Sequence, residues 1–309
     1  MIDNPFKYSD TNKRYYTFDY MMRQRFGSKC VKIPIDAGFT CPNIDGKSGR
    51  GGCSYCTLPH RCSDLRGVNI EEQYKIQKER LSHKWKDALC LPYLQDYTNT
   101  YAPTEKLKTL YQRVLALPGA IGIDIATRCD ALDDSCIKYL KELSSDNFLI
   151  LELGLQTVHD KTAEKINRGH TYRQFLETYK KLDGLNVCIH IINSLPGEND
   201  EMMLQTAREI ARLHPFMLKI HMLYIEEGTP IARSYKSGEF ELLSSEEYTS
   251  IVCRQLELLP PDICIGRITG DGRKSTLIAP EWSKKKFVCM NEIDKYLKRN
   301  NSFQGINNS

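Results

Sequence analysis

The chain has 309 residues and a net charge of +4 at neutral pH, with 41% hydrophobic and 27% charged residues. These values exclude a disordered or fibrous protein, and the length permits two ordinary domains or one large α/β domain with an appendage. No apolar run reaches the roughly 18–20 residues of a membrane span. The opening residues, MIDNPFKYSD, also lack an export signal. We therefore expect a cytoplasmic protein without a membrane partner.

Short apolar runs alternate along the chain with longer amphipathic stretches. Each run holds several apolar residues in a short window, which is typical of buried parallel strands. The predicted strands are Lys29–Ile35, Ala88–Leu94, Ala120–Ala126, Phe148–Leu155, Val187–Ile192 and Leu218–Ile225. The amphipathic stretches predict helices at Ile70–Lys86, Thr104–Ala116, Asp133–Leu143, Tyr172–Leu182, Asp200–Leu213 and Ser244–Leu258.

This alternation indicates an α/β fold with a parallel sheet, either open or curved into part of a barrel. We expect a core domain over residues 29–259, preceded by a basic and aromatic segment at 1–28. Residues 260–309 predict a small α+β extension, with a strand at Ile263–Ile268, a lysine-rich helix at Lys284–Lys298 and a frayed tail. Functional residues in such folds gather at the carboxyl ends of the strands.

Twelve cysteines are the most informative feature of the composition. Because the cytosol keeps thiols reduced, they are core thiols, reactive thiols or metal ligands rather than disulfides. Cys41, Cys53 and Cys56 follow the first predicted strand, and the last two form a C-x2-C pair. Glycines in the same loop permit close approach of the backbone: Gly38, Gly46, Gly49, Gly51 and Gly52.

Three interpretations of this loop remain open on the residues alone. The cysteines could be unrelated loop thiols, or they could form a structural zinc site completed by Cys62 or Cys30, because such sites take four ligands. They could also hold an iron–sulfur cluster with one iron left open, since thiolates select soft metals. The position after the first strand of a βα series favours the cluster.

The three-cysteine loop resembles that of the radical S-adenosylmethionine (SAM) superfamily, in which an aromatic residue such as Tyr55 precedes the last cysteine. The spacing C-x11-C-x2-C resembles the widened form in the YhcC-like subgroup, which is related to the catalytic subunit of elongator. Further matching segments are YTNTYAP at 97–103, Thr127-Arg128, LELGLQTVHD at 151–160, INRGH at 166–170, LPGE at 195–198 and KIHMLYIEEGTPI at 219–231. The subgroup continues Thr-Arg with Pro-Asp-Cys, whereas this chain has Cys129-Asp130-Ala131, so no role is assigned to Cys129.

The resemblance implies a (βα)6 partial TIM barrel of the radical SAM type. It implies that Cys41, Cys53 and Cys56 bind a [4Fe–4S] cluster and that SAM occupies the fourth iron. It also implies reductive cleavage of SAM to a 5′-deoxyadenosyl radical, with an electron donor such as flavodoxin or ferredoxin. In such enzymes the cofactors carry the chemistry, and the protein binds and orients them.

Candidate SAM-binding residues lie near the ends of the predicted strands. Glu152 and Gln156 are four residues apart in an extended segment and so face the same side. A buried Glu152 needs a partner, which could equally be a structural Lys or Arg. Many members use a Gly-Gly-Glu triplet after the second strand. This chain lacks the triplet. We assign its role, contact with the SAM amino group, to Tyr97, Thr98 and Asn99, which could also form a polar surface turn.

Other candidates follow from the remaining matched segments. Arg128 suits a bidentate contact with the SAM carboxylate, although a structural ion pair is a competing interpretation. Asn193 and Gly197 close the fifth strand, in the turn that lies near the ribose and adenine in the family. His190 and His221 are interpreted as core histidines. The sequence does not identify a catalytic residue.

Basic residues recur at both ends of the chain. An early group is interleaved with tyrosines, and a later group comprises Lys284, Lys285 and Lys286. Basic side chains beside aromatic rings suit a folded RNA, but they also suit a solvated surface. The resemblance to elongator, which acts on tRNA, favours tRNA as the substrate. The alternatives are a radical SAM enzyme acting on a small metabolite or cofactor, and a zinc-stabilised RNA-binding module without catalysis.

Overall fold

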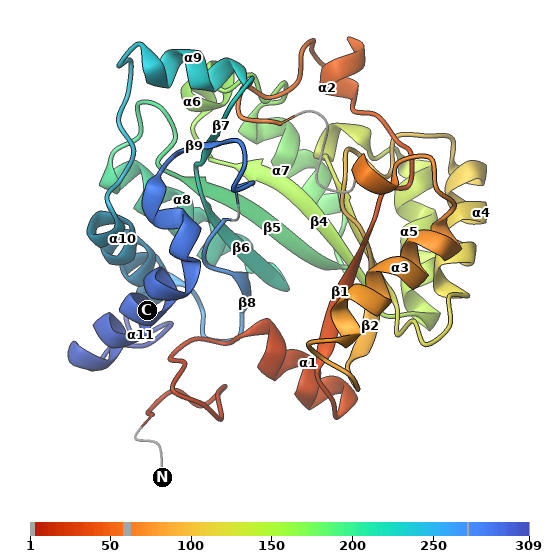
Figure 1. The fold of residues 1–309 in the computed structure, drawn as a ribbon, viewed down its shortest axis with the longest axis horizontal. Helices are drawn as coiled ribbons and strands as arrows, with labels where there is room; N and C mark the ends of the chain where they lie inside the picture. Colours follow the sequence, from red (N-terminus) through yellow and green to blue (C-terminus); the bar gives the residue numbers. More distant parts are fainter. Residues whose placement is uncertain (1–3, 58–62, 271, 309) are drawn as a thin grey trace.

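A curved sheet of seven parallel strands forms the centre of the molecule (Figure 1). The computed structural model describes residues 4–57, 63–270 and 272–308. The strands follow one another across the sheet in the order β1 (Cys30–Ile35), β2 (Leu89–Leu94), β3 (Ile123–Thr127), β4 (Leu149–Gln156), β5 (Asn186–Asn193), β6 (Met217–Met222) and β8 (Cys264–Arg267). Each neighbouring pair is parallel. The predicted partial barrel is therefore confirmed.

Helices on the outer, convex side of the sheet return the chain from one strand to the next. They are α3 (Ile70–Ser82), α4 (Thr104–Leu115), α5 (Asp134–Asp146), α7 (Tyr172–Lys181), α8 (Asp200–Leu213) and α10 (Ser245–Leu258). The short α6 (Asp160–Lys165), which precedes α7, lies near the carboxyl ends of the strands (Figure 1). Polar residues cap the amino ends of several of the outer helices: Asn69, Asp133, Thr171, Asn199 and Ser244. Such caps satisfy backbone N–H groups that have no partner inside the helix.

Shorter elements surround the carboxyl ends of the strands or connect the main helices. They are α2 (Pro42–Asp45), η1 (Ser63–Leu65), η2 (Cys129–Ala131) and α9 (Pro230–Lys236). The predicted sixth strand is interrupted after Met222. The chain then forms β7 (Ile225–Glu226), which pairs antiparallel with β9 (Leu277–Ala279).

The segment after residue 260 is integrated into the main sheet. Its strand β8 pairs with β6, while η3 (Glu281–Lys285) leads into α11 (Lys286–Arg299), which packs against α10. The prediction of a frayed tail is wrong. Gln304 is fully buried, and its amide nitrogen donates to the carbonyls of Pro260 (2.6 Å) and Ile263 (2.9 Å). Its oxygen accepts from the backbone of Tyr16.

Helix α1 (Phe18–Phe26) lies across the lower end of the half-barrel in Figure 1, near β1 and β8. Its Met21 and Met22 pack against inward-facing apolar side chains: Cys30, Leu91, Ile150, Cys188, Met217 and Cys264. The amino end of the barrel is therefore filled by side chains, and polar groups gather at the carboxyl end. Among the described residues, none of the helices has the length and apolarity needed to cross a membrane.

Candidate active site

A cavity of about 350 Å³ opens at the carboxyl ends of the strands. Most of the residues that the sequence predicted for the cluster and SAM line it: Cys41, Cys53, Tyr55, Cys56, Tyr97, Thr98, Arg128, Glu152 and Gln156. These residues come from the β1–α3 loop, the segment after β2, the end of β3 and strand β4. The sheet thus brings residues far apart in the sequence to one site.

Backbone hydrogen bonds fix the cysteine loop. The carbonyl of Cys41 accepts from the N–H of Ile44 and Asp45, and that of Cys53 accepts from Cys56. Ser54 donates its backbone N–H to Ile166, which ties the loop to the INRGH segment. Gly51 and Gly52 have φ values of +80° and +76°, which side chains with a Cβ rarely adopt. The glycines therefore allow the two halves of the loop to meet.

Two thiols of this loop, those of Cys53 and Cys56, lie where thiolate charge is unfavourable without a cation. Burial raises the pKa of Cys53 and Cys56, and the charge of the neighbouring cysteines raises it further. Arg128 opposes the rise in pKa at both thiols. Metal binding requires deprotonated thiols, and a bound soft cation would compensate the clustered charge. The donor set therefore fits an iron–sulfur cluster.

The two candidates for a fourth thiol ligand differ in position. Cys30 begins β1, packs with Met22 at the amino end of the barrel and does not line the cavity. Cys62 lies outside the described residues. A zinc site completed by Cys30 is therefore excluded by the fold.

Arg128 and Thr98 line the cavity in different ways. The Arg128 guanidinium donates from Nε and Nη2 to Asp130, each over 2.8 Å, so the competing ion pair is present. Its Nη1 lies 4.0 Å from Sγ of Cys53. Thr98 is buried, and its Oγ1 has no hydrogen-bond partner among the described residues. A buried hydroxyl without a partner is costly, so Thr98 suits contact with a polar ligand group.

Three of the predicted SAM-binding residues do not line the cavity. The amide nitrogen of Asn99 donates to the carbonyls of Leu94, Asp96 and Ala126 and so holds the β2 loop. Asn193 exchanges two hydrogen bonds with Gln255, at 2.8 and 2.9 Å. Gly197 has a φ of +84° and forms part of a turn. These residues shape the surrounding backbone, although Oδ1 of Asn99 has no hydrogen-bond partner among the described residues.

Glu152 is the centre of a buried charged cluster inside the barrel, which comprises Lys32, Tyr93, Asp124, Glu152, His190 and Lys219. Its carboxylate accepts from Lys32 (2.7 Å), Lys219 (2.6 Å), Tyr93 (2.6 Å) and His190 (2.9 Å). Lys32 also contacts Asp124. The structural pairing of Glu152 that the sequence left open is therefore present, although Glu152 also lines the cavity.

The charges of this cluster are set by burial and by one another. Burial raises the pKa of Glu152, but Lys219 and Lys32 outweigh it, so that the net pKa lies well below its ordinary value. Burial and the charge of Glu152 raise the pKa of Asp124 to about 7. Burial also lowers the pKa of His190. The two lysines thus favour the anionic form of Glu152.

Sequence reasoning missed most of this cluster. The available signal was one or two polar residues inside an apolar strand, such as Lys32 in CVKIPI, and Lys219 and His221 in MLKIHM. Tyr93 pairs with Asp124 in the sheet register, and His190 pairs with Lys219. The sequence alone indicates that His190 and His221 are core histidines, yet both line the cavity, with ring centroids 5.3 Å apart.

Comparison with known proteins identifies the family. Residues 47–210, more than half of the chain, match the family model of the Radical SAM superfamily. The chain belongs to the radical SAM superfamily. Residues 215–299 match the Radical_SAM C-terminal domain, which spans β6 to α11 and includes the predicted boundary at residue 260. Members of the superfamily generally bind a [4Fe–4S] cluster and SAM.

Several bacterial and archaeal proteins are similar to this chain in sequence. It is 44% identical to protein YtqA of Bacillus subtilis, over 99% of this chain and 96% of YtqA. It is 33% identical to protein YhcC of Escherichia coli, over 89% of this chain and 90% of YhcC. It is also 28% identical to a tRNA uridine(34) acetyltransferase of Methanocaldococcus jannaschii, over 49% of this chain but only 28% of that protein.

The fold agrees with these matches. The archaeal Methanocaldococcus infernus Elp3 superimposes with a TM-score of 0.65 at 17% identity, covering 90% of this chain and 64% of Elp3. The chain is also 30% identical to human Elongator complex protein 3, over 50% of this chain and 29% of that protein. The sequence matches confirm the relation to the YhcC-like proteins and to the elongator catalytic subunit. The protein is a radical SAM enzyme.

Proposed function

We propose that this enzyme binds a [4Fe–4S] cluster through Cys41, Cys53 and Cys56, binds SAM in the adjoining cavity, and modifies tRNA. The observation that carries the cofactor assignment is the convergence of three thiols on a cavity that also contains the Thr98 hydroxyl, which lacks a partner among the described residues. When bound, the cluster and SAM supply reductive cleavage to a 5′-deoxyadenosyl radical. An electron donor such as flavodoxin or ferredoxin would provide the electron.

The chain's own residues would bind and orient these groups. Tyr55 lies between the cysteines of the C-x2-C pair and lines the same cavity as the three thiols. Thr98 offers a hydroxyl, and Gln156 offers an amide from a backbone with φ of +67° at a bulge in β4. Tyr97 lies at the rim, where its hydroxyl accepts from Arg66. Glu152 supports the cavity through Lys32 and Lys219.

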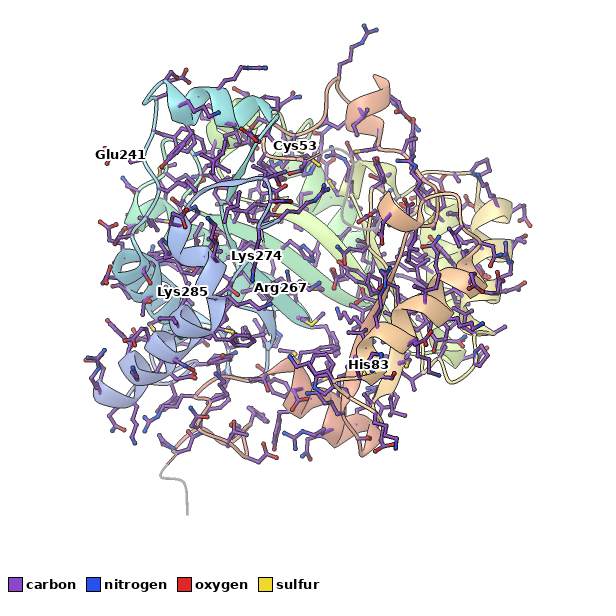
Figure 2. All side chains as sticks on the ribbon, in the orientation of Figure 1. Cys53, His83, Glu241, Arg267, Lys274 and Lys285 are labelled. Carbon is purple, nitrogen blue, oxygen red and sulfur yellow. The ribbon has the colours of Figure 1, made fainter. Side chains whose placement is uncertain are left out.

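The proposal that tRNA is the substrate draws on a relative and on surface charge. The matched acetyltransferase is named for a tRNA uridine. Arg267 and Arg273 line the cavity, and the chain continues through β9 to the lysines at 284–286. Figure 2 labels Arg267, Lys274 and Lys285 on this part of the molecule. Basic side chains that extend from a site onto the surface suit a polyanion.

The N-terminal basic residues contribute less than their sequence suggests. Acidic side chains already pair with Lys13, Arg23 and Lys29. Arg14 is buried and donates to Asn301 and Ser302. The early segment therefore packs on the barrel. In the 284–286 region Lys284 also pairs with an acid, Glu281, over 2.7 Å, but this exposed contact contributes little and RNA phosphates could replace it, so the region stays our candidate for contact with RNA.

Reversing the charge of Lys284, Lys285 and Lys286 to Glu should weaken tRNA binding. The salt dependence should also become shallower, by roughly 0.7 in the slope of log affinity for each phosphate that the lysines no longer neutralise. Filter binding of bulk tRNA across a salt series measures both quantities. The matched control reverses Lys138 and Lys141, which are exposed on the outer helix α5, and should leave binding unchanged.

The substrate assignment is tested in cells and with the purified enzyme. Deleting the gene should remove or replace one modified nucleoside in bulk tRNA, and added tRNA should stimulate formation of 5′-deoxyadenosine. An unchanged nucleoside profile together with no stimulation would favour the small-metabolite alternative.

A further inference from the structure

The thiol of Cys53 is contacted by a buried amide from its own loop. Asn43 lies in α2, two residues after Cys41, and is fully buried. Its Nδ2 donates to the carbonyl of Asn167 over 2.6 Å and to Sγ of Cys53 over 3.6 Å. An amide nitrogen carries two N–H groups, so one side chain can serve both acceptors.

The surrounding loop fixes the orientation of this amide. Both neighbours of Nδ2 are acceptors, which requires the nitrogen rather than the oxygen at that position. On the other side, a Cβ added at Gly49 or Gly169 would lie 2.1 or 2.5 Å from Oδ1 of Asn43. Only glycine leaves room there for the oxygen. The loop therefore directs the N–H group of Asn43 toward the sulfur.

Another group adds positive character at the same sulfur. Nη1 of Arg128 lies 4.0 Å from Sγ of Cys53, and Asp130 holds the rest of the guanidinium in place. Cys53 is thus a thiol on which an amide N–H and a cation converge.

We propose that Asn43 is a positioning residue that raises the reduction potential of the cluster through the sulfur of Cys53. Hydrogen bonds to ligand sulfurs withdraw electron density and so stabilise the reduced, more negative cluster. The inference rests on the proposed function, because it requires a cluster bound by Cys53. It assigns to Asn43 a role in the ease of reduction, separate from the binding of SAM or substrate.

The test compares reduction potentials of anaerobically reconstituted variants. The signal of the reduced cluster is followed by electron paramagnetic resonance at poised potentials, without SAM or tRNA. Asn43→Ala removes the donor and should shift the potential to a more negative value. Asn167→Gly is the matched control: it removes a side chain that binds the carbonyls of Arg50 and Gly52 in the same loop but does not contact the sulfur. It should keep the wild-type potential.

The outcomes separate the role of Asn43 from the cluster assignment. A negative shift in Asn43→Ala alone, with iron content retained, supports the inference. An unchanged potential, or an equal shift in Asn167→Gly, overturns it. If Asn43→Ala loses iron, the reduction potential of Gly49→Ala is measured instead, because the added Cβ displaces the amide of Asn43 without removing it. An unchanged potential in Gly49→Ala overturns the inference. A wild-type chain without iron would overturn the proposed function and this inference together.

Discussion

Replacing Cys41, Cys53 or Cys56 with alanine is expected to abolish the binding of about four irons per chain, because each thiolate holds one iron of the proposed cluster. Iron and acid-labile sulfide would be measured after anaerobic reconstitution. The effect should be equally severe at all three positions, because the three thiols share one cavity and three ligands already leave one iron open.

Two other cysteines serve as controls for this result. Cys62→Ala should retain the iron, because SAM rather than a protein thiol would bind the fourth iron. Cys136→Ala removes a buried thiol of the outer helix α5 and should also retain it. Stoichiometric zinc instead of iron, or equal metal loss in Cys62→Ala, would contradict the assignment.

Replacing Glu152 with glutamine should destabilise the fold by about 3–5 kcal/mol, because it leaves the buried Lys219 without a contacting anion and Lys32 with Asp124 alone. Lys219 is only 6% exposed, so water compensates little for the lost carboxylate. Urea unfolding of the apoprotein measures the effect. Glu201→Gln, in the exposed ion pair with Arg208, is the matched control and should cost less than about 1 kcal/mol.

The pH dependence of this difference follows from the lowered pKa of Glu152. A carboxyl group with a lowered pKa contributes stability above its unfolded pKa of about 4.3 and loses it as the pH falls through the folded value. The charge of Glu152 also helps to raise the pKa of Asp124 to about 7, which costs the wild type stability as the pH rises toward neutrality. The advantage of the wild type over Glu152→Gln should therefore be greatest near pH 5 and shrink both toward pH 8 and in stronger acid. A difference below about 1 kcal/mol at neutral pH would show that the cluster does not depend on this charge.

The same variant separates a structural role from SAM binding. We expect Glu152→Gln to weaken SAM binding while the absorbance of the cluster is retained, because Glu152 lines the cavity. Equilibrium dialysis with labelled SAM measures this. Unchanged SAM affinity together with reduced stability would show that Glu152 acts through Lys32 and Lys219 alone.

The regular part of the fold could be predicted because its signal is local. Six of the apolar runs became strands of the sheet, and the long amphipathic stretches became its outer helices. The packing of the tail could not be predicted, because Gln304 is ordered by the carbonyls of Pro260 and Ile263, which lie 44 and 41 residues away in the chain. From the sequence, these last residues are recognisable only as a polar segment, and their packing partners are not.

The site was predictable where one motif carries it and unpredictable where the sheet assembles it. The cysteine loop is contiguous, and spacing alone gathers Cys41, Cys53 and Cys56. The charged cluster is contributed one residue per strand, so Lys32 and Lys219 become partners of Glu152 only in the folded sheet. The contact of Asn43 with Cys53 likewise depends on how the loop closes.

Cleavage of SAM by the reduced enzyme tests the central claim most directly. The reconstituted protein, reduced anaerobically with dithionite and mixed with SAM, should form 5′-deoxyadenosine and methionine slowly without substrate. Cys53→Ala should form neither under the same conditions. A wild-type protein that carries about four irons yet yields no 5′-deoxyadenosine, with or without tRNA, would contradict the account.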